Sequence, residues 1–369
     1  GGTEVFFTNL REILETREEI DPTWVFIEFY PKDFVARIPL VSKNWTLKGG
    51  LITRSRISAL ERSGKTFDVA FFNHVIPATF LQGFRKRVPT VFLLDVTPPL
   101  FDMYSSWYSE GSEAGNKLFE NLRYKVTQKV YADAAYIFTM SDLVKHSLIR
   151  DYRIDDRKIE VLPPGINVTK WTRVLGERRS GHSRNGNPKI LFVGGDFIRK
   201  GGDLLLKIAR REELKHCEFH LVTKDPVGAV SENVRVYQNL KANSDQLLTL
   251  YRDADVFVLP TRADFSPHAI WEAMTMELPI VTTNVGGLGE AVVDAENGFI
   301  VPVDDEEVLV DRLVRIVSDP ELRVRLGRNG RRLAESKFNL EKNVEKILEQ
   351  LKHVADRGKI GDLRWSPKN

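Results

Sequence analysis

The segment ADVFVLPTRADFSPHAIWEAM, residues 254–274, joins a short apolar run, a polar loop and a helical pattern. The run DVFVLPT (255–261) is rich in β-branched and aromatic side chains, which predicts a buried strand. Ser266 is a good N-cap and Pro267 suits the first turn of a helix, so we expect a helix to begin at Pro267. A strand, a loop and a helix in this order form the repeating unit of a parallel α/β sheet.

The same unit recurs along the chain, with helical patterns such as LLLKIARREEL (204–214) between the apolar runs. Strands are expected at 23–29, 69–75, 90–96, 134–140, 189–195, 218–224, 255–261 and 279–285. Continuous apolar runs bounded by turn residues are typical of strands that are buried on both faces. The pattern therefore predicts the α/β class, with parallel sheets built from βαβ units.

The length of 369 residues favours two domains. Residues 176–187 are polar, glycine-rich and basic, and we interpret them as a linker between domains at 1–175 and 188–338. A long surface loop within one domain is the alternative interpretation. Residues 339–369 begin with an apolar face at helical spacing, which predicts a final helix followed by a tail.

The N-terminal residues Gly1-Gly2 lead directly into a helical pattern. A glycine turn that opens a helix usually follows a strand in folds of this kind. We therefore expect a first strand of the N-terminal domain to precede Gly1.

The composition limits the classes of function. Charged residues make up 28% of the chain and the net charge is +3, which implies no strong field for nucleic acid but permits a weak contact with an anionic membrane. The single cysteine, Cys217, excludes an intrachain disulfide and fits a reducing compartment. No apolar run approaches the ~18 residues of a membrane span. We expect a cytoplasmic protein, with peripheral contact at the inner membrane face left open.

Two carboxylates flank the helix start at Pro267. Asp264 lies in the loop and Glu272 lies one to two turns inside the helix, so they are too far apart to share a proton. They would contact different parts of one extended ligand, with the free amides of the helix N-terminus between them as a phosphate site. The alternative is an acidic residue that stabilises the helix dipole and a surface glutamate.

A basic, glycine-rich turn, GGDFIRKGG (194–202), follows the strand expected at 189–195. Arg199 and Lys200 would place two positive charges at the carboxyl end of that strand, which suits a diphosphate. The turn matches neither the dinucleotide-binding glycine motif nor the P-loop. The alternative is an exposed turn with solvated basic residues, and we expect both side chains to be exposed.

His74 and Asp95 end two of the strands expected in the first half. Both side chains should face the crevice at the carboxyl edge of a parallel sheet; a structural histidine is the alternative. No cluster of histidine, cysteine and acidic residues has metal-ligand spacing, and no serine or cysteine nucleophile is paired with a base.

Four fragments together resemble a known family. IEVLPPGIN (159–167), ILFVGGDFIRKGGDLLLKIA (190–209), the segment 254–274 and LPIVTTNVGGLGEAVVDAENGFIVP (278–302) occur in the order found in retaining glycosyltransferases of family 4. That family adopts the GT-B fold, in which two Rossmann-like domains face a central cleft. The resemblance is dense over residues 120–335.

The resemblance implies roles for the residues already singled out. Glu272 would hold the ribose hydroxyls of a nucleotide sugar, Asp264 would lie by the donor sugar and Lys200 would neutralise the diphosphate. The arginine of the family often stands at the position of Gly195, so Arg199 is expected to substitute for it. The other donor-binding positions that the resemblance implies are Gly2, Phe265, Ser266, Pro267, His268 and Glu290.

Several positions depart from the family pattern. Asp264 replaces the usual glutamate, Glu277 stands where a glycine is usual, and Leu94 stands where many members have a histidine. His74 or Asp95 would therefore take the role of that histidine.

The resemblance implies a retaining, metal-independent transferase without a cofactor. It would move a sugar from a nucleotide-diphosphate sugar to a hydroxyl of a saccharide, a lipid-linked acceptor or a small molecule. The alternatives are a catalytically silent binding or scaffold protein and a sugar-nucleotide epimerase of the same fold.

Overall fold

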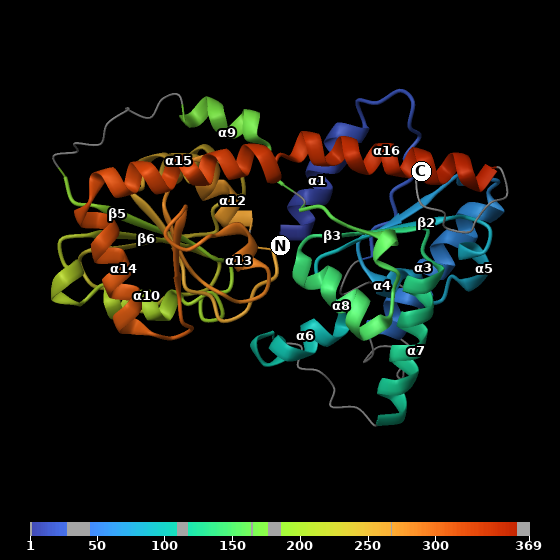
Figure 1. Ribbon diagram of the computed structural model, residues 1–369, viewed down its shortest axis with the longest axis horizontal. Helices are drawn as coiled ribbons and strands as arrows, with labels where there is room; N and C mark the ends of the chain where they lie inside the picture. Colours follow the sequence, from blue (N-terminus) through green and yellow to red (C-terminus); the bar gives the residue numbers. More distant parts are fainter. Residues whose placement is uncertain are drawn as a thin grey trace.

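The computed structural model describes residues 2–27, 45–108, 117–163, 165–175, 186–266 and 268–359. The chain forms two α/β domains that lie side by side (Figure 1). The N-terminal domain has a four-stranded parallel sheet of order β1-β2-β3-β4, and the C-terminal domain has a six-stranded parallel sheet of order β10-β9-β8-β5-β6-β7. The expected class, α/β with two parallel sheets, is confirmed.

The N-terminal sheet is built from short strands with a fully buried centre. Its strands are β1 (Ala70–Phe72), β2 (Thr90–Leu94), β3 (Tyr136–Thr139) and β4 (Ile159–Val161). Its helices are α1 (Gly2–Leu14), α3 (Trp45–Arg62), α4 (Val75–Ala78), α5 (Gln82–Arg85), α6 (Pro98–Tyr104), η2 (Ser105–Trp107), α7 (Lys117–Asp133), α8 (Asp142–Tyr152) and η3 (Asp156–Lys158). The next helix, α9 (Val168–Leu175), packs on the C-terminal domain, where Trp171 belongs to the core (Figure 1). All five residues of β2 are buried, as expected for a continuous apolar run with helices on both faces.

The C-terminal domain follows the same plan. Its strands are β5 (Lys189–Val193), β6 (Glu218–Thr223), β7 (Val234–Gln238), β8 (Val256–Leu259), β9 (Ile280–Thr283) and β10 (Gly298–Val301). Its helices are α10 (Gly202–Ile208), η4 (Glu212–Leu214), α11 (Asp245–Asp253), α12 (His268–Thr275), α13 (Leu288–Ala291), α14 (Glu306–Ser318) and α15 (Pro320–Lys337), and α16 (Leu340–Lys359) follows them. The sheet order reverses between β5 and β8, so the loops that follow these two strands share one edge.

The final helix returns to the N-terminal domain. Figure 1 shows α16 running from the end of α15 along the N-terminal domain, beside α1. Val344 and Ile347 of α16 share a buried cluster with Phe6 and Leu10 of α1 and with β2 and β3. Packing of this apolar face ties the end of the chain to the first domain.

The prediction of a strand at 23–29 is wrong for residues 23–27, the part that the structure describes, because these residues pair with no strand. Trp24 and Phe26 stack on each other and Phe26 is 56% exposed, so this apolar run is not a buried strand. Conversely, β7 was not expected, because an edge strand with a half-exposed VRVYQ sequence has no continuous apolar run. Residues 176–185 of the expected linker, the tail from 360 and Pro267 lie outside the described residues.

Candidate functional site

Two glycine turns bring three loops together at the carboxyl ends of β5, β8 and β9. Gly201 has φ +81°, and a Cβ there would lie 2.2 Å from the carbonyl oxygen of Pro260 after β8. Gly286 has φ +57°, and a Cβ there would lie 1.8 Å from the carbonyl oxygen of Asp264. Only glycine permits these backbones to approach so closely. The turn 194–202 is thereby pressed against the loop that carries Asp264.

This packing places the ammonium of Lys200 in an ion pair with the carboxylate of Asp264. The two side chains are 14% and 11% exposed. Burial and the neighbouring Arg199 guanidinium lower the pKa of Lys200 to about 7, and the Asp196 carboxylate opposes this effect. The expectation of exposed basic side chains is wrong, since Arg199 is also only 14% exposed.

The guanidinium of Arg199 has partners from both domains. Its Nε donates to Asp196 at 2.8 Å, and its Nη1 donates to the carbonyl oxygen of Ala263 at 2.6 Å. Its carbon lies 4.6 Å from the centre of the Tyr108 ring, which comes from the N-terminal domain. Tyr108 also stacks on Phe265, with ring centres 6.3 Å apart, and burial raises the pKa of its hydroxyl. Aromatic residues after α6 therefore line this side of the site.

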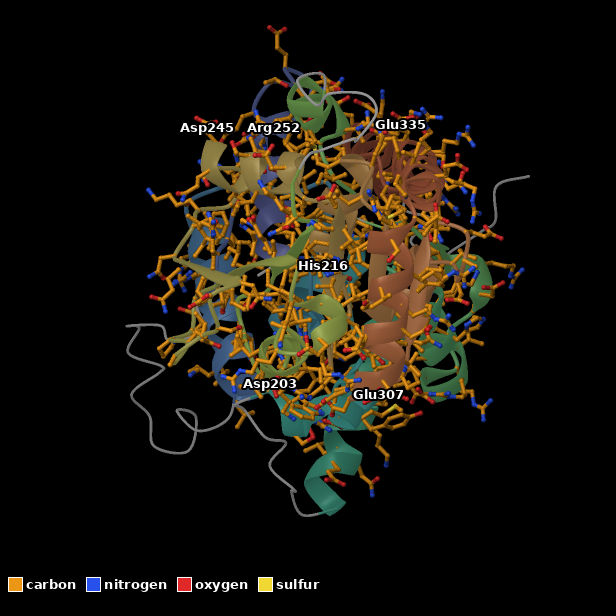
Figure 2. The ribbon with its side chains drawn as sticks, turned by 90° about the vertical axis from the view of Figure 1, so that its left-hand side faces the viewer. Asp203, His216, Asp245, Arg252, Glu307 and Glu335 are labelled. Atoms are coloured by element: carbon orange, nitrogen blue, oxygen red, sulfur yellow. The ribbon has the colours of Figure 1, made fainter. Side chains whose placement is uncertain are left out.

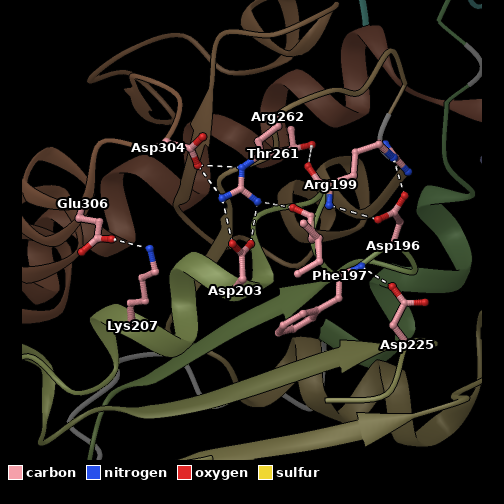
Figure 3. A network of polar contacts seen from close by, with 11 residues as sticks. Asp196, Phe197, Arg199, Asp203, Lys207, Asp225, Thr261, Arg262, Asp304 and Glu306 are labelled. Atoms are coloured by element: carbon pink, nitrogen blue, oxygen red, sulfur yellow. Dashed lines mark hydrogen bonds and ion pairs between the residues drawn. The ribbon is translucent and has the colours of Figure 1, made fainter. Parts of the chain in front are cut away.

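Sequence reasoning missed Arg262, which organises the loop after β8 (Figure 3). Its guanidinium donates to both carboxylate oxygens of Asp203, at 2.7 and 3.0 Å, and its Nε donates to Asp304 at 2.8 Å. It also lies over the Trp107 ring, 5.3 Å from the centre. The sequence does contain a signal for this residue. Arg262 is a basic residue two positions before Asp264, in the loop between the strand and the helix.

Glu272 is buried on α12, and its carboxylate is hydrogen-bonded to Tyr251, a residue that the sequence did not indicate. The hydroxyl of Tyr251 on α11 donates to its Oε2 at 2.7 Å. Burial raises the pKa of Glu272 to about 7, and the hydrogen bond from Tyr251 acts in the opposite direction. Nothing in the local sequence pairs these two residues, which lie 21 positions apart.

The residues at the start of α12 face the N-terminal domain and the basic turn. The hydroxyl of Ser266 lies 3.5 Å from the sulfur of Met140, and Phe265 packs edge-on against Tyr104. Burial, with the nearby positive charge of Lys200, lowers the pKa of His268 to about 3, so its imidazole is neutral. Its Nε2 is buried and, within the described part of the chain, has no hydrogen-bond partner.

Glu290 joins the two domains. Its two carboxylate oxygens accept hydrogen bonds from the backbone amides of Asp142, at 2.8 Å, and Leu143, at 3.0 Å, at the N-terminus of α8. Gly287 lies so close to Ser141 that a Cβ would be 3.0 Å from the serine Cβ. The carboxylate that was expected to line the nucleotide side is thus engaged by a helix of the other domain.

His74 and Asp95 follow β1 and β2 and lie close enough to interact. The Nδ1 of His74 accepts a hydrogen bond from the Ile76 amide at 3.1 Å, so the proton of the neutral imidazole is on Nε2. Burial lowers the pKa of His74, and the Asp95 carboxylate opposes this effect. Asp95 also contributes, after burial, to the raised pKa of Tyr108.

Gly195 and Gly2 are the two glycines of the expected donor site. A Cβ at Gly195 would make only an ordinary van der Waals contact, with the Lys224 side chain at 3.9 Å, so this position does not require glycine for space. Gly2 begins α1, and this end of α1 lies between the two domains (Figure 1).

Among the described residues, no group of three or more histidine, cysteine, aspartate or glutamate side chains is arranged to hold a metal ion. No described helix has the length and apolar character needed to cross a membrane.

The comparisons with known proteins agree along most of the chain. Residues 1–170 match the family model described as Glycosyltransferase Family 4, and residues 176–333 match the model described as Glycosyl transferases group 1. The capsular polysaccharide biosynthesis glycosyltransferase CapM of Staphylococcus aureus is 36% identical over 222 residues, which cover 56% of this chain and 58% of CapM. The matched regions span about half the length of the first curated relatives.

Solved structures share the fold. A sucrose-phosphate synthase from Thermosynechococcus elongatus superposes with a TM-score of 0.73 at 18% identity, covering 96% of this chain and 94% of that one. The Anabaena protein HepE, solved in complex with UDP-glucose, superposes with a TM-score of 0.62 at 15% identity, covering 82% and 83% of the two chains. These likenesses confirm the GT-B fold. The two family models, which together match most of the chain, show that it belongs to glycosyltransferase family 4.

Proposed function

We propose that this protein is a retaining glycosyltransferase that moves a sugar from a nucleotide-diphosphate sugar to an acceptor hydroxyl. The observation that carries the proposal is the Lys200–Asp264 ion pair beside the start of α12, with the buried Glu272 one turn further along that helix. A cation, a helix N-terminus and two carboxylates in this order suit the successive parts of such a donor.

Each group has a distinct task in this proposal. Lys200 and the first amides of α12 stabilise the negative charge that develops on the leaving diphosphate. Asp264 lies where positive charge develops on the sugar, and Glu272 accepts hydrogen bonds from ribose hydroxyls. Arg199 adds a second positive charge for the diphosphate, and its guanidinium lies close enough to Lys200 to lower the pKa of that lysine.

The N-terminal domain would supply the acceptor side. The Nε2–H of His74 is a donor of fixed tautomer, and the adjacent Asp95 is an acceptor. In a retaining transfer the acceptor hydroxyl attacks from the face that the diphosphate leaves, and the leaving phosphate takes its proton. The acceptor is a hydroxyl of a saccharide, a lipid-linked sugar or a small molecule.

The relatives support the class of donor and acceptor. HepE was solved with UDP-glucose, and CapM is named for the synthesis of a capsular polysaccharide. A nucleotide sugar and a saccharide acceptor therefore fit this chain. The transfer is proposed to be metal-independent, because cationic side chains and helix amides supply the charge stabilisation.

The test is turnover with UDP-, ADP- and GDP-sugars, alone and with a panel of saccharide and lipid-linked acceptors. We expect nucleotide release with at least one donor, a product of unchanged anomeric configuration by NMR, and full activity in EDTA. Inverted configuration would overturn the retaining mechanism, and an EDTA-sensitive rate restored by magnesium would overturn metal independence. Epimerised donor, or nucleotide binding without turnover, would favour the epimerase or the silent binding protein.

A further inference from the structure

Glu272 and Tyr251 form a buried unit, and Tyr251 has no task in the transfer chemistry described above. Tyr251 is completely buried and Glu272 is 9% exposed. The tyrosine hydroxyl donates to Oε2 of the glutamate at 2.7 Å, and among the described residues Oε1 accepts no hydrogen bond. A buried carboxylate without partners is costly, so one oxygen is satisfied within the protein and the other is available to a ligand.

The position of the Tyr251 hydroxyl is determined by the core of the C-terminal domain. Its ring packs edge-on against Trp171, with centres 5.2 Å apart, and stacks on Phe257 of β8 at 5.9 Å. It is carried by α11, which Figure 2 locates through the labelled Asp245 and Arg252. A side chain held on a helix by close packing fixes its hydrogen-bond partner more firmly than a loop residue would.

We infer that Tyr251 is a positioning residue for the donor: by holding Oε2 of Glu272, it orients the carboxylate so that Oε1 meets the ribose of a nucleotide sugar. This inference rests on the proposed function. Tyr251 does not itself contact the donor, and its effect passes through Glu272 alone.

Tyr251 also favours the charged form of the carboxylate. An ionised Glu272 accepts hydrogen bonds at both oxygens, whereas the protonated acid loses acceptor capacity. Burial raises the pKa of Glu272 to about 7, and the tyrosine hydrogen bond is the contribution that lowers it. The other charged groups around α12 have partners of their own or are neutral: Arg331 of α15 donates to the Thr275 carbonyl oxygen and pairs with Glu335, Lys200 pairs with Asp264, and His268 is neutral. The strands packed against α12, β8 and β9, carry no ionisable side chains.

The experiment measures the affinity for UDP, ADP and GDP by calorimetry between pH 6 and 9. Two groups set the pH dependence of the wild-type affinity near pH 7: ionisation of Glu272 strengthens the contact with ribose, whereas loss of the Lys200 charge weakens the contact with the diphosphate. Lys200 is the same in both proteins, so the difference between the variant and wild-type profiles reports Glu272. Tyr251→Phe should move the midpoint of the Glu272 effect up by about one pH unit, so that binding relative to wild type is weakened by up to about tenfold near neutral pH and largely restored at pH 9. The donor KM should rise in parallel, with kcat unchanged at saturation.

Two matched variants test the assignment. Tyr237→Phe removes a tyrosine hydroxyl that lies 2.9 Å from His220 in the same domain, and it should leave nucleotide affinity and its pH dependence unchanged. In a Glu272→Gln background, Tyr251→Phe should have no further effect on affinity. An equal loss of affinity in both backgrounds would overturn the inference, because Tyr251 would then act independently of Glu272.

The failure of this inference is distinct from the failure of the proposed function. A wild-type protein that binds none of the nucleotides would overturn the proposed function. Weak binding by Glu272→Gln together with a wild-type profile for Tyr251→Phe would overturn the role of Tyr251 only. Should Tyr251→Phe not fold, incorporation of 3-fluorotyrosine at position 251 strengthens the donor and should move the midpoint down; an unchanged midpoint would contradict the inference.

Discussion

Lys200 and Asp264 form an ion pair at the point where the loops after β5 and β8 meet, and both side chains are largely buried. The two residues belong to turns that are 64 positions apart in the sequence. Because the ammonium and the carboxylate are paired, each neutralises the other's buried charge. Both residues therefore contribute to the stability of the folded site as well as to its proposed chemistry. Removal of one charge leaves the other buried without a partner, which is more costly than removal of both.

Lys200→Ala should destabilise the protein by roughly 3 kcal/mol, and the double variant Lys200→Ala/Asp264→Ala should recover part of this loss. Denaturant unfolding of both variants measures the difference. Lys207→Ala is the matched control, because Lys207 is 63% exposed and pairs with Glu306 on the surface; it should change stability by no more than about 0.5 kcal/mol. A double variant as unstable as the sum of its single variants would show that the pair is not coupled.

Steady-state kinetics should separate the roles of the two carboxylates. Glu272→Gln weakens a charge-assisted hydrogen bond to ribose that is worth roughly 1.5–3 kcal/mol, in ground and transition state alike, so donor KM should rise. Asp264→Asn removes negative charge where positive charge develops, so kcat should fall. The measurement uses saturating acceptor. Unchanged kinetics in both variants would mean that the carboxylates serve stability alone.

Glu272 should also make the protein less stable as the pH rises. Its pKa in the folded protein is raised from 4.5 to about 7, so the folded state binds more protons than the unfolded state between these values. Stability should therefore decline from about pH 4.5 to 7, and Glu272→Gln should be more stable than wild type at pH 8 by about 2–3 kcal/mol. Thermal unfolding at pH 5 and 8 tests this, and a variant that is less stable at pH 8 would contradict it.

Glu290 should hold the two domains together through α8. Glu290→Ala removes both hydrogen bonds to the amides of Asp142 and Leu143, and with them the negative charge at the N-terminus of that helix. Small-angle scattering should show a larger radius of gyration, and kcat/KM should fall. Glu296→Ala, an exposed glutamate of the same segment, is the control and should match wild type. An unchanged radius for Glu290→Ala would show that other contacts hold the two domains together.

Glu277 carries a local backbone strain that glycine would relieve. It has φ +57°, and the resemblance to the family implies a glycine at this position. The left-handed conformation costs a residue with a Cβ roughly 1–2 kcal/mol, partly offset by the greater flexibility of glycine in the unfolded chain. Glu277→Gly should therefore raise the melting temperature, whereas Glu277→Ala, which keeps the Cβ, should not. A lower melting temperature for the glycine variant would show that the Glu277 side chain makes a compensating contact.

The sequence by itself determined the parallel α/β class and the residues at the carboxyl ends of its strands. Periodicity and turn residues are local signals, so they identified the strand and the loop around Asp264, and the basic turn with Lys200. Buried polar networks are not local. Tyr251 meets Glu272 from 21 positions away and Arg262 meets Asp203 from 59 positions away. Whether a charge is free or paired depends on which loops the packing brings together, and for this reason only the tertiary structure decided that Lys200 contacts Asp264, that Glu290 binds α8 and that Tyr108 covers Arg199.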